Sequence, residues 1–422
     1  MTERAVGAGS SHTRIGLIKF MIFMMFFMFA MTTDSVGVII PKIIEEFGLS
    51  MTAAGAFHYV TMAAIALSAI LFGYWADKLG HKKSILIGLA LFAVSAYLFI
   101  VGSSFAFFIF LLAISGTSIG IFKTGALALI GDVSKSTTDH TSTMNLVEGF
   151  FGVGAIVGPA IVVYLFSQNV SWQWLYAIAA TLCVVLLLVA LFLRPPKLEK
   201  KSHEAVDLKG TFRMMKNPYA LYFSVAAFLY VSVECAVYVW MPMMLKGYTG
   251  DVTWLVVYSM SIFFAFRAIG RFLGAWVLAR FNWSWVLTIF SGIVFICFAA
   301  SITYGPSVAI YLLPLSGLFM SMIYPTINSK GISCFPKERH GAISGVILFF
   351  TCFSAAVGPL AMAAVSDFGG DIVYGFTLAA VLAFLLFAQM LYNSVFKPTQ
   401  EHLERLNASE YGEMVQTGGV SE

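Results

Sequence analysis

Long apolar stretches dominate this sequence of 422 residues. Runs of about twenty apolar residues, each bounded by charged or turn residues, have the length that an α-helix needs to cross a bilayer. The sequence contains twelve, at residues 15–41, 52–76, 83–102, 104–130, 143–167, 172–193, 218–245, 253–279, 284–304, 307–332, 341–366 and 372–396. The charged fraction of 11% excludes an ordinary soluble domain, in which it is nearer a quarter. The sequence predicts an all-α membrane protein with twelve transmembrane helices.

Polar segments divide the chain into parts. Residues 1–14 and 397–422 are polar, and we expect the C-terminal one to be a mobile tail. A long polar linker at 194–217 follows the sixth apolar run. We therefore expect one six-helix bundle at 15–193 and a second at 218–396.

The distribution of Lys and Arg among the loops indicates how the chain is oriented in the membrane. If the N-terminus is cytoplasmic, the inside loops hold most Lys and Arg residues, and the outside loops keep only Lys42 and Lys246. The positive-inside rule then places both termini in the cytoplasm. The net charge of +4 reflects this topology, so we expect the lipid bilayer, and no nucleic acid, as a partner. The five cysteines are scattered singly without CxxC spacing, which predicts free thiols and no metal site.

The two halves of the chain share a pattern at a period of about 200 residues. The matching positions are Asp34 and Glu234, Pro41 and Pro242, Ser115-Gly116 and Ser316-Gly317, Asp139-His140 and Arg339-His340, and Gly158-Pro159 and Gly358-Pro359. All five pairs occur in the same order in both halves, and the two members of each pair are separated by nearly the same number of residues. They therefore predict two pseudo-symmetric six-helix halves related as parallel repeats. Such halves form a central cavity at their interface.

Asp34 lies in the apolar stretch FAMTTDSVGVIIP. An ionised Asp at the centre of a transmembrane helix costs roughly 2.5 to 3.5 kcal/mol, so it usually faces a cavity or a partner. The alternative is a residue that reaches the interface from near a helix end, but Asp34 is roughly 12 to 15 Å from the polar Lys42, Glu45 and Glu46. Asp34 is therefore a candidate functional residue, with Glu234 as its repeat partner.

The loop GYWADKLGHKK, residues 73–83, matches G-x-x-x-D-[RK]-x-G-[RK]-[RK], and it resembles the loop signature of the major facilitator superfamily. The matching residues are Gly73, Asp77, Lys78, Gly80 and Lys82. Its glycines allow a tight turn, and Asp77 is placed to cap a helix or to pair with an arginine. A decayed second copy, FLGAWVLARFNWSW, offers Arg280, with Arg271 nearby, as gate partners of Asp77.

Four further segments resemble the fucose, galactose and glucose symporters of that superfamily. These are MNLVEGFFGVGAIVGP, LYVSVECAVYVWMP, FRAIGRFLGAWVLARF and SGLFMSMIYPTINS. In that family an acid on the first span carries the coupling cation, and an acid on the fourth and an Asn on the fifth bind the sugar. Asp34 and Asn145 match the first and third of these. The resemblance implies cation symport of a monosaccharide, with H⁺ favoured over Na⁺, by a monomer in the bacterial inner membrane.

The fourth span departs from the family, because Lys123 stands where the family has an acid. Glu148 on the fifth span lies at a comparable depth, so the two predict an intramembrane ion pair. A functional lysine is the alternative. Both residues join the candidate substrate contacts.

Other polar and aromatic residues of the spans complete the candidate set. Tyr238, Trp240, Tyr324 and Asn328 are substrate-binding candidates, although aromatic residues also form interfacial belts. His58 is either a proton-sensitive gate residue or an interface histidine. Arg267 either neutralises Glu234 or reaches the interface.

No enzyme motif occurs: metal-ligand spacing, a phosphate-binding loop and a nucleophile elbow are all missing from the sequence. The sequence therefore predicts no enzyme and no cofactor other than the coupling ion. The favoured function is sugar uptake by cation symport through alternating access. One alternative is a proton-coupled exporter of drugs or other amphipathic solutes. Another is a transporter-like sensor or lipid-handling protein that does not transport.

Overall fold

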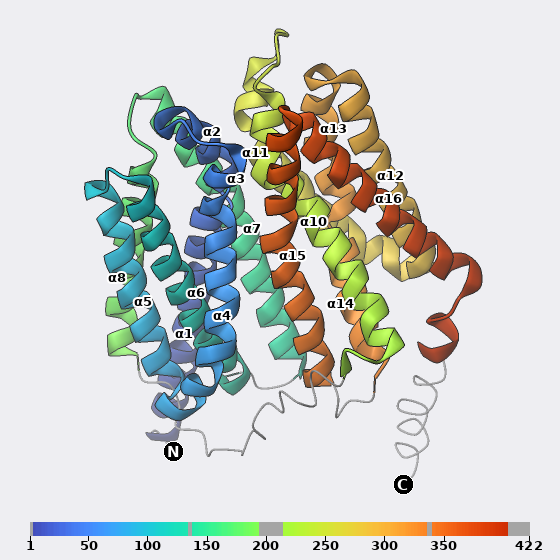
Figure 1. Cartoon of the computed structure of the whole chain (residues 1–422). Helices are drawn as coiled ribbons and strands as arrows, with labels where there is room; N and C mark the ends of the chain where they lie inside the picture. The colour runs from blue at the N-terminus through green and yellow to red at the C-terminus, as the bar shows by residue number, and fades with distance from the viewer. Residues whose placement is uncertain (1–2, 134–136, 194–213, 336–339, 404–422) are drawn as a thin grey trace. The chain divides into compact units, whose positions relative to one another are not determined.

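A computed structural model describes residues 3–133, 137–193, 214–335 and 340–403, although some side chains within these ranges, including those of residues 69–79 and 144–145, are not described. The described residues contain twelve helical segments long and apolar enough to cross a membrane. The predicted all-α fold with twelve transmembrane helices is therefore confirmed. Figure 1 shows these helices along the chain.

The chain forms two compact units, one of residues 1–203 with 257–264 and one of residues 204–256 with 265–422. The first half of the chain holds α1 (Glu3–Thr33), α2 (Val36–Phe47), α3 (Met51–Ala54), α4 (Ala56–Leu79), α5 (His81–Leu98), the 3₁₀ turn η1 (Phe99–Val101), α6 (Phe105–Val133), α7 (Thr137–Ser167) and α8 (Gln173–Phe192). The second half holds α10 (Pro218–Leu245), α11 (Thr253–Arg280), α12 (Trp283–Tyr304), α13 (Pro306–Met320), α14 (Ile323–Ser333), α15 (His340–Gly369) and α16 (Ile372–Phe396).

Two spans that the sequence predicts as continuous are broken. The tenth span divides between α13 and α14 at Ser321 and Met322. Pro325 explains this break, because it has no N–H for the carbonyl of Ser321 and its ring clashes with that carbonyl. The first span divides between α1 and α2 at Asp34 and Ser35. Discontinuous helices recur at the binding sites of secondary transporters, so both breaks are places to look for function.

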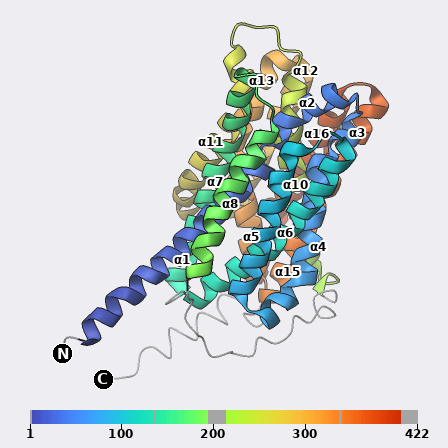
Figure 2. The same ribbon diagram turned by 90° about the vertical axis from the view of Figure 1, so that its left-hand side faces the viewer.

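Both ends of the chain depart from the predicted tails. Residues 3–14, expected to precede the first helix, are part of α1, whose N-terminal turns extend beyond the neighbouring helices in Figure 2. Residues 397–403 are not a mobile tail. Thr399 is buried and donates a hydrogen bond to Asn393 Oδ1 at 2.7 Å. His402 stacks on Tyr219 with ring centroids 4.1 Å apart. These contacts attach the segment to α10 and α16.

Equivalent helices of the two halves pack in the same way. α1 packs against α7 in the first unit, and α10 packs against α15 in the second. Glycine makes the first contact close, because a Cβ at Gly154 would overlap the carbonyl oxygen of Phe27. In the second unit a Cβ at Gly358 would lie 2.8 Å from Ser232 Oγ. The repeated Gly-Pro segments are thus the positions at which α7 and α15 approach their partners.

Candidate functional site

Asp34 occupies the break between α1 and α2 and is only 7% exposed. Thr33 Oγ1 lies 3.2 Å from Asp34 Oδ2 and 3.1 Å from the carbonyl oxygen of Phe29. Ser35 Oγ donates to the carbonyl of Met31 at 2.7 Å. Hydroxyls that bond back to the carbonyl four residues earlier often bend helices. The same local sequence therefore explains both the break and the polar surroundings of the carboxylate.

Lys123 on α6 approaches the helix that carries Asp34. Its Nζ lies 5.0 Å from the ring centroid of Phe29 and 5.7 Å from that of Phe26. These distances are within the range of cation–π attraction. Glu148, the predicted ion-pair partner on α7, is exposed. The ammonium is thus placed against α1, and the predicted pair with Glu148 stays a prediction.

Glu234, the repeat partner of Asp34, has very different surroundings. Arg267 Nη2 on α11 lies 2.7 Å from Glu234 Oε1, and both side chains are largely buried. Tyr230 OH is 2.7 Å from the same oxygen and 2.9 Å from the carbonyl of Met320. A guanidinium at this distance compensates the charge of the carboxylate. Of the two interpretations of Arg267, neutralisation of Glu234 is the one observed.

Tyr324 and Asn328 lie one turn apart on α14, directly after the second helix break. The Tyr324 ring stacks on Tyr230 with centroids 6.0 Å apart, and its hydroxyl is 3.3 Å from Thr351 Oγ1. Asn328 is half-buried, and its amide has both donors and an acceptor. The second unit therefore brings a phenol and an amide to one face beside the Glu234–Arg267 pair.

The two aromatic candidates on α10 are buried. Trp240 is 1% exposed, and its Nε1 donates to the carbonyl of Pro359 at 3.2 Å. Tyr238 OH lies 2.8 Å from Cys235 Sγ on the same helix. The indole of Trp240 therefore packs against α15, and its N–H is already hydrogen-bonded to a backbone carbonyl of that helix.

Comparison with known proteins shows the family. Residues 22–359 match the family model of the Major Facilitator Superfamily. The chain belongs to this superfamily. As a member, it is a membrane transporter and is expected to act on a small molecule in a lipid environment.

The chain is similar to curated proteins whose names give different functions. The chain is 24% identical to the L-fucose-proton symporter of Escherichia coli (strain K12) over 411 residues, 87% of this chain and 91% of the relative. It is 31% identical to the quinolone resistance protein NorA of Staphylococcus aureus (strain MRSA252), but over only 42% of this chain and 46% of that protein. The solved nucleoside transporter NupG shares the fold, with a TM-score of 0.74 and 15% identity over 90% of this chain and 99% of NupG.

The superfamily loop motif contains two residues with clear structural roles. Gly80, between α4 and α5, has φ +88°, a conformation that favours glycine. Lys82 Nζ lies 2.9 Å from the carbonyl of Leu191 and 2.5 Å from that of Leu193. Positive charge at a helix C-terminus is stabilising, so Lys82 caps α8. The side chains of Asp77 and Lys78 and the surroundings of Gly73 lie outside the described residues, as does the side chain of Asn145.

The decayed second motif copy has contacts of its own. The Arg280 guanidinium lies 4.1 Å from the ring centroid of Trp276, one turn earlier on α11. Arg271 on the same helix is half-buried, and its role at the gate stays a prediction.

Several polar residues beside the two carboxylates were not predicted. Thr33 and Ser35 flank Asp34, and two hydroxyl residues this close together could have indicated a helix break, because their side chains bond back to the helix backbone. Tyr230 lies four residues before Glu234, the spacing at which two side chains meet on one helix face. His58, predicted either as a proton-sensitive gate residue or as an interface histidine, is fully buried, and its role at a gate stays a prediction.

The position of Gly158 makes a prediction that bears on Asp34. A Cβ at Gly158 would overlap the carbonyl oxygen of Met31 and Ser35 Oγ. We expect Gly158→Ala to destabilise the protein by about 1 to 3 kcal/mol through overpacking and to impair transport, because the displaced segment carries Asp34. Thermal unfolding and transport in liposomes measure both effects.

Gly152 provides the matched control on the same helix. A Cβ there would meet nothing within 4 Å, so Gly152→Ala should be neutral or stabilise α7 by about 1 kcal/mol. If the two alanine variants behave alike, close packing at Gly158 is not what holds the Asp34 segment in place.

Proposed function

We propose that this transporter takes up a monosaccharide of the fucose, galactose or glucose type by proton symport, with Asp34 as the proton carrier. One observation supports the choice of carrier above the others. Glu234 has the Arg267 guanidinium 2.7 Å away, so its charge is already compensated when the solute is absent. This pair makes Glu234 less suited to take up and release a proton. Asp34 lies at a helix break and is largely buried beside the hydroxyls of Thr33 and Ser35, and we assign the role of proton carrier to it.

Coupling follows from the cost of burying charge. An ionised carboxylate opposes closure of a cavity around it, because closure removes it from water. Protonation of Asp34 removes that penalty and permits the change between outward-open and inward-open states. A proton gradient then drives the cycle in one direction. The similarity to a proton symporter over most of the chain supports H⁺ as the coupling ion.

Neutral sugars offer many hydroxyl groups, so the proposed contacts are groups that both donate and accept hydrogen bonds. In the second unit these are Tyr324 and Asn328, beside the break between α13 and α14. In the first unit the proposed contacts are Asn145, whose amide does both, Lys123, which donates, and Glu148, which accepts. Lys123 supplies a donor where the related family has an acid. It therefore also favours a second solute class, sugar acids, whose carboxylate would pair with the ammonium.

Transport by purified protein in liposomes tests the proposal. With an alkaline interior, we expect radiolabelled L-fucose, D-galactose, D-glucose or D-galacturonate to accumulate, and a protonophore to abolish the accumulation. A sodium gradient without a proton gradient should have no effect. Both termini are proposed to be cytoplasmic and the protein to work as a monomer in the bacterial inner membrane.

The match to NorA supports a second candidate, a proton-coupled exporter of amphipathic solutes. Inside-out vesicles distinguish the two, because an exporter would load a lipophilic dye when their lumen is acidic. Dye loading without any sugar accumulation would replace symport by export. If neither assay detects transport but sugars still raise the unfolding temperature, the protein is a sensor rather than a carrier.

A further inference from the structure

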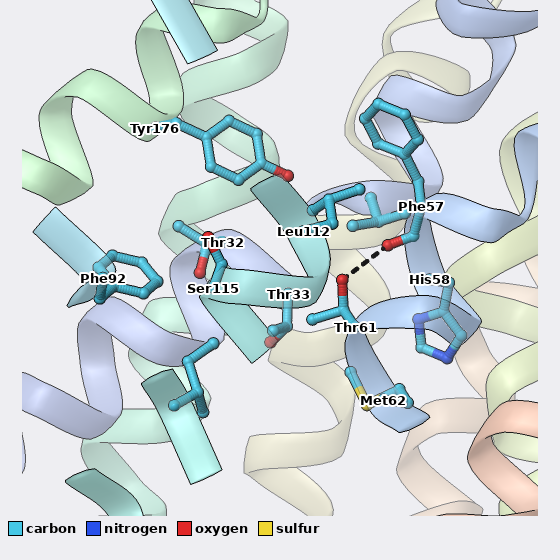
Figure 3. Close-up of a pocket in the computed structure, with 12 residues that line it drawn as sticks. Thr32, Thr33, Phe57, His58, Thr61, Met62, Phe92, Leu112, Ser115 and Tyr176 are labelled. Atoms are coloured by element: carbon cyan, nitrogen blue, oxygen red, sulfur yellow. Dashed lines mark hydrogen bonds between the residues drawn. The ribbon is translucent and has the colours of Figure 1, made fainter. Parts of the chain in front are cut away.

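A small cavity lies within the first unit, next to the helix break at Asp34. Six helices, α1, α2, α4, α5, α6 and α8, contribute to its lining. The lining is largely apolar, and its hydroxyl groups come from Thr32 and Thr33 of α1, Thr61 of α4, Ser115 of α6 and Tyr176 of α8 (Figure 3). The space open to the centre of a water molecule is about 10 Å³, close to the minimum that holds one water. The cavity is therefore too small for any solute and large enough for a single water molecule.

The hydroxyl of Tyr176 requires a partner in this cavity. The side chain is 2% exposed, and its OH has no hydrogen bond to any residue that the structure describes. The ring cannot turn outwards, because it stacks on Phe99 with centroids 3.9 Å apart and meets Trp172 edge-on at 6.0 Å. Burying a hydroxyl without a partner is costly. A phenylalanine would fill the same space at no such cost.

Two threonine hydroxyls around the cavity have already used their protons. Thr32 Oγ1 donates to the carbonyl of Phe29 at 2.9 Å, and Thr61 Oγ1 donates to that of Phe57 at 3.0 Å. Ser115 Oγ shares a hydrogen bond of 2.9 Å with Ser95 Oγ. Threonine oxygens whose protons are used can still accept. Among the hydroxyls of the lining, Tyr176 is thus a donor without a partner among the described residues, and the threonine oxygens can accept, which suits a molecule that accepts once and donates twice.

We propose that this cavity binds one ordered water molecule, which accepts a hydrogen bond from Tyr176 OH and donates to the threonine hydroxyls. Through Thr33 the water also reaches the coupling site. Thr33 Oγ1 lies within hydrogen-bond distance of both Asp34 Oδ2 and the carbonyl of Phe29, and it cannot donate to both at once. A water that donates to Thr33 Oγ1 strengthens this hydroxyl as a donor to the ionised carboxylate. This role at Asp34 rests on the proposed function; the binding of water does not.

Substitution of Tyr176 by Phe tests the water by the sign of a stability change. If the water is present, Tyr176→Phe removes its donor, and the unfolding temperature should fall by about 2 °C. If the cavity is dry, the same change removes an unsatisfied hydroxyl, and the unfolding temperature should rise. Tyr97→Phe is the matched control, because Tyr97 is 40% exposed and bonds Thr181 Oγ1 on the outside of the unit. It should change the unfolding temperature little.

X-ray hydroxyl-radical footprinting gives a second measurement that needs no variant. Radicals form from bound water, so Tyr176 should be labelled although it is only 2% exposed. A rise in unfolding temperature for Tyr176→Phe, or the absence of label on Tyr176, overturns the proposal. These outcomes do not depend on transport. Failure of sugar uptake would therefore remove the role at Asp34 and leave the water site standing.

Discussion

Asp34→Asn should abolish accumulation of solute against its gradient while exchange of labelled for unlabelled solute continues. Asparagine keeps the size and hydrogen bonding of a protonated aspartate but cannot release a proton. The carrier then stays permanently in the state that permits closure, and it equilibrates solute without coupling. Liposomes measure both activities: uptake driven by a pH gradient should reach no more than the external concentration, and counterflow should persist.

The control for this variant is an exposed carboxylate near the end of α2, the helix that follows Asp34. Glu46→Gln on α2 removes a negative charge from a side chain in contact with solvent, so concentrative uptake should be unchanged. Accumulation that survives in Asp34→Asn would rule out Asp34 as the proton carrier. Loss of both accumulation and exchange would leave the carrier role unsupported as well, because protonation alone could not then explain the defect.

Removal of either partner of the buried Glu234–Arg267 pair should be strongly destabilising, and removal of both should not. Arg267→Met leaves a buried carboxylate without its guanidinium, and Glu234→Met leaves the reverse, so each should cost about 3 to 5 kcal/mol. The double variant removes both charges, and Tyr230 OH keeps its bond to the carbonyl of Met320. We therefore expect its stability to return to that of the parent protein, as measured by chemical unfolding of all four proteins.

The exposed pair between Lys42 and Glu45 gives the comparison for this cycle. Its two charged atoms are 3.3 Å apart, but the side chains are 48% and 66% exposed, so Lys42→Met should cost at most about 1 kcal/mol. Transport by the double variant then decides the role of Glu234. Concentrative uptake would show that the pair is structural, whereas a stable double variant that only exchanges solute would establish Glu234 as a coupling residue, the role its repeat position predicts.

The sequence specified the membrane fold because the relevant signal is local. Twenty apolar residues suffice to define a span, since backbone hydrogen bonds in a bilayer must close within the helix. The twelve spans and the superfamily loop motif were readable in this way. Asp34 and Glu234 were found by the same logic, because each is a charge in an apolar run.

The partners of those charges depended on the tertiary structure. Arg267 meets Glu234 and Lys123 meets Phe29 only because particular faces of neighbouring helices turn towards each other. In an apolar helix the residues on nearly every face are similarly hydrophobic, so the sequence gives little indication of which face turns towards a neighbouring helix. Trp240 illustrates the result: its neighbours in sequence suit a binding aromatic, but packing of α10 on α15 buries it.

Local sequence thus determined how many helices this protein has, where they run and which charges they bury, because the bilayer imposes these through length and hydropathy alone. The tertiary structure decided which buried charge is already compensated. It also decided that Tyr176 of α8 shares a cavity with Thr33 of α1. These contacts join residues far apart in the chain, and the packing of several helices at once sets their geometry.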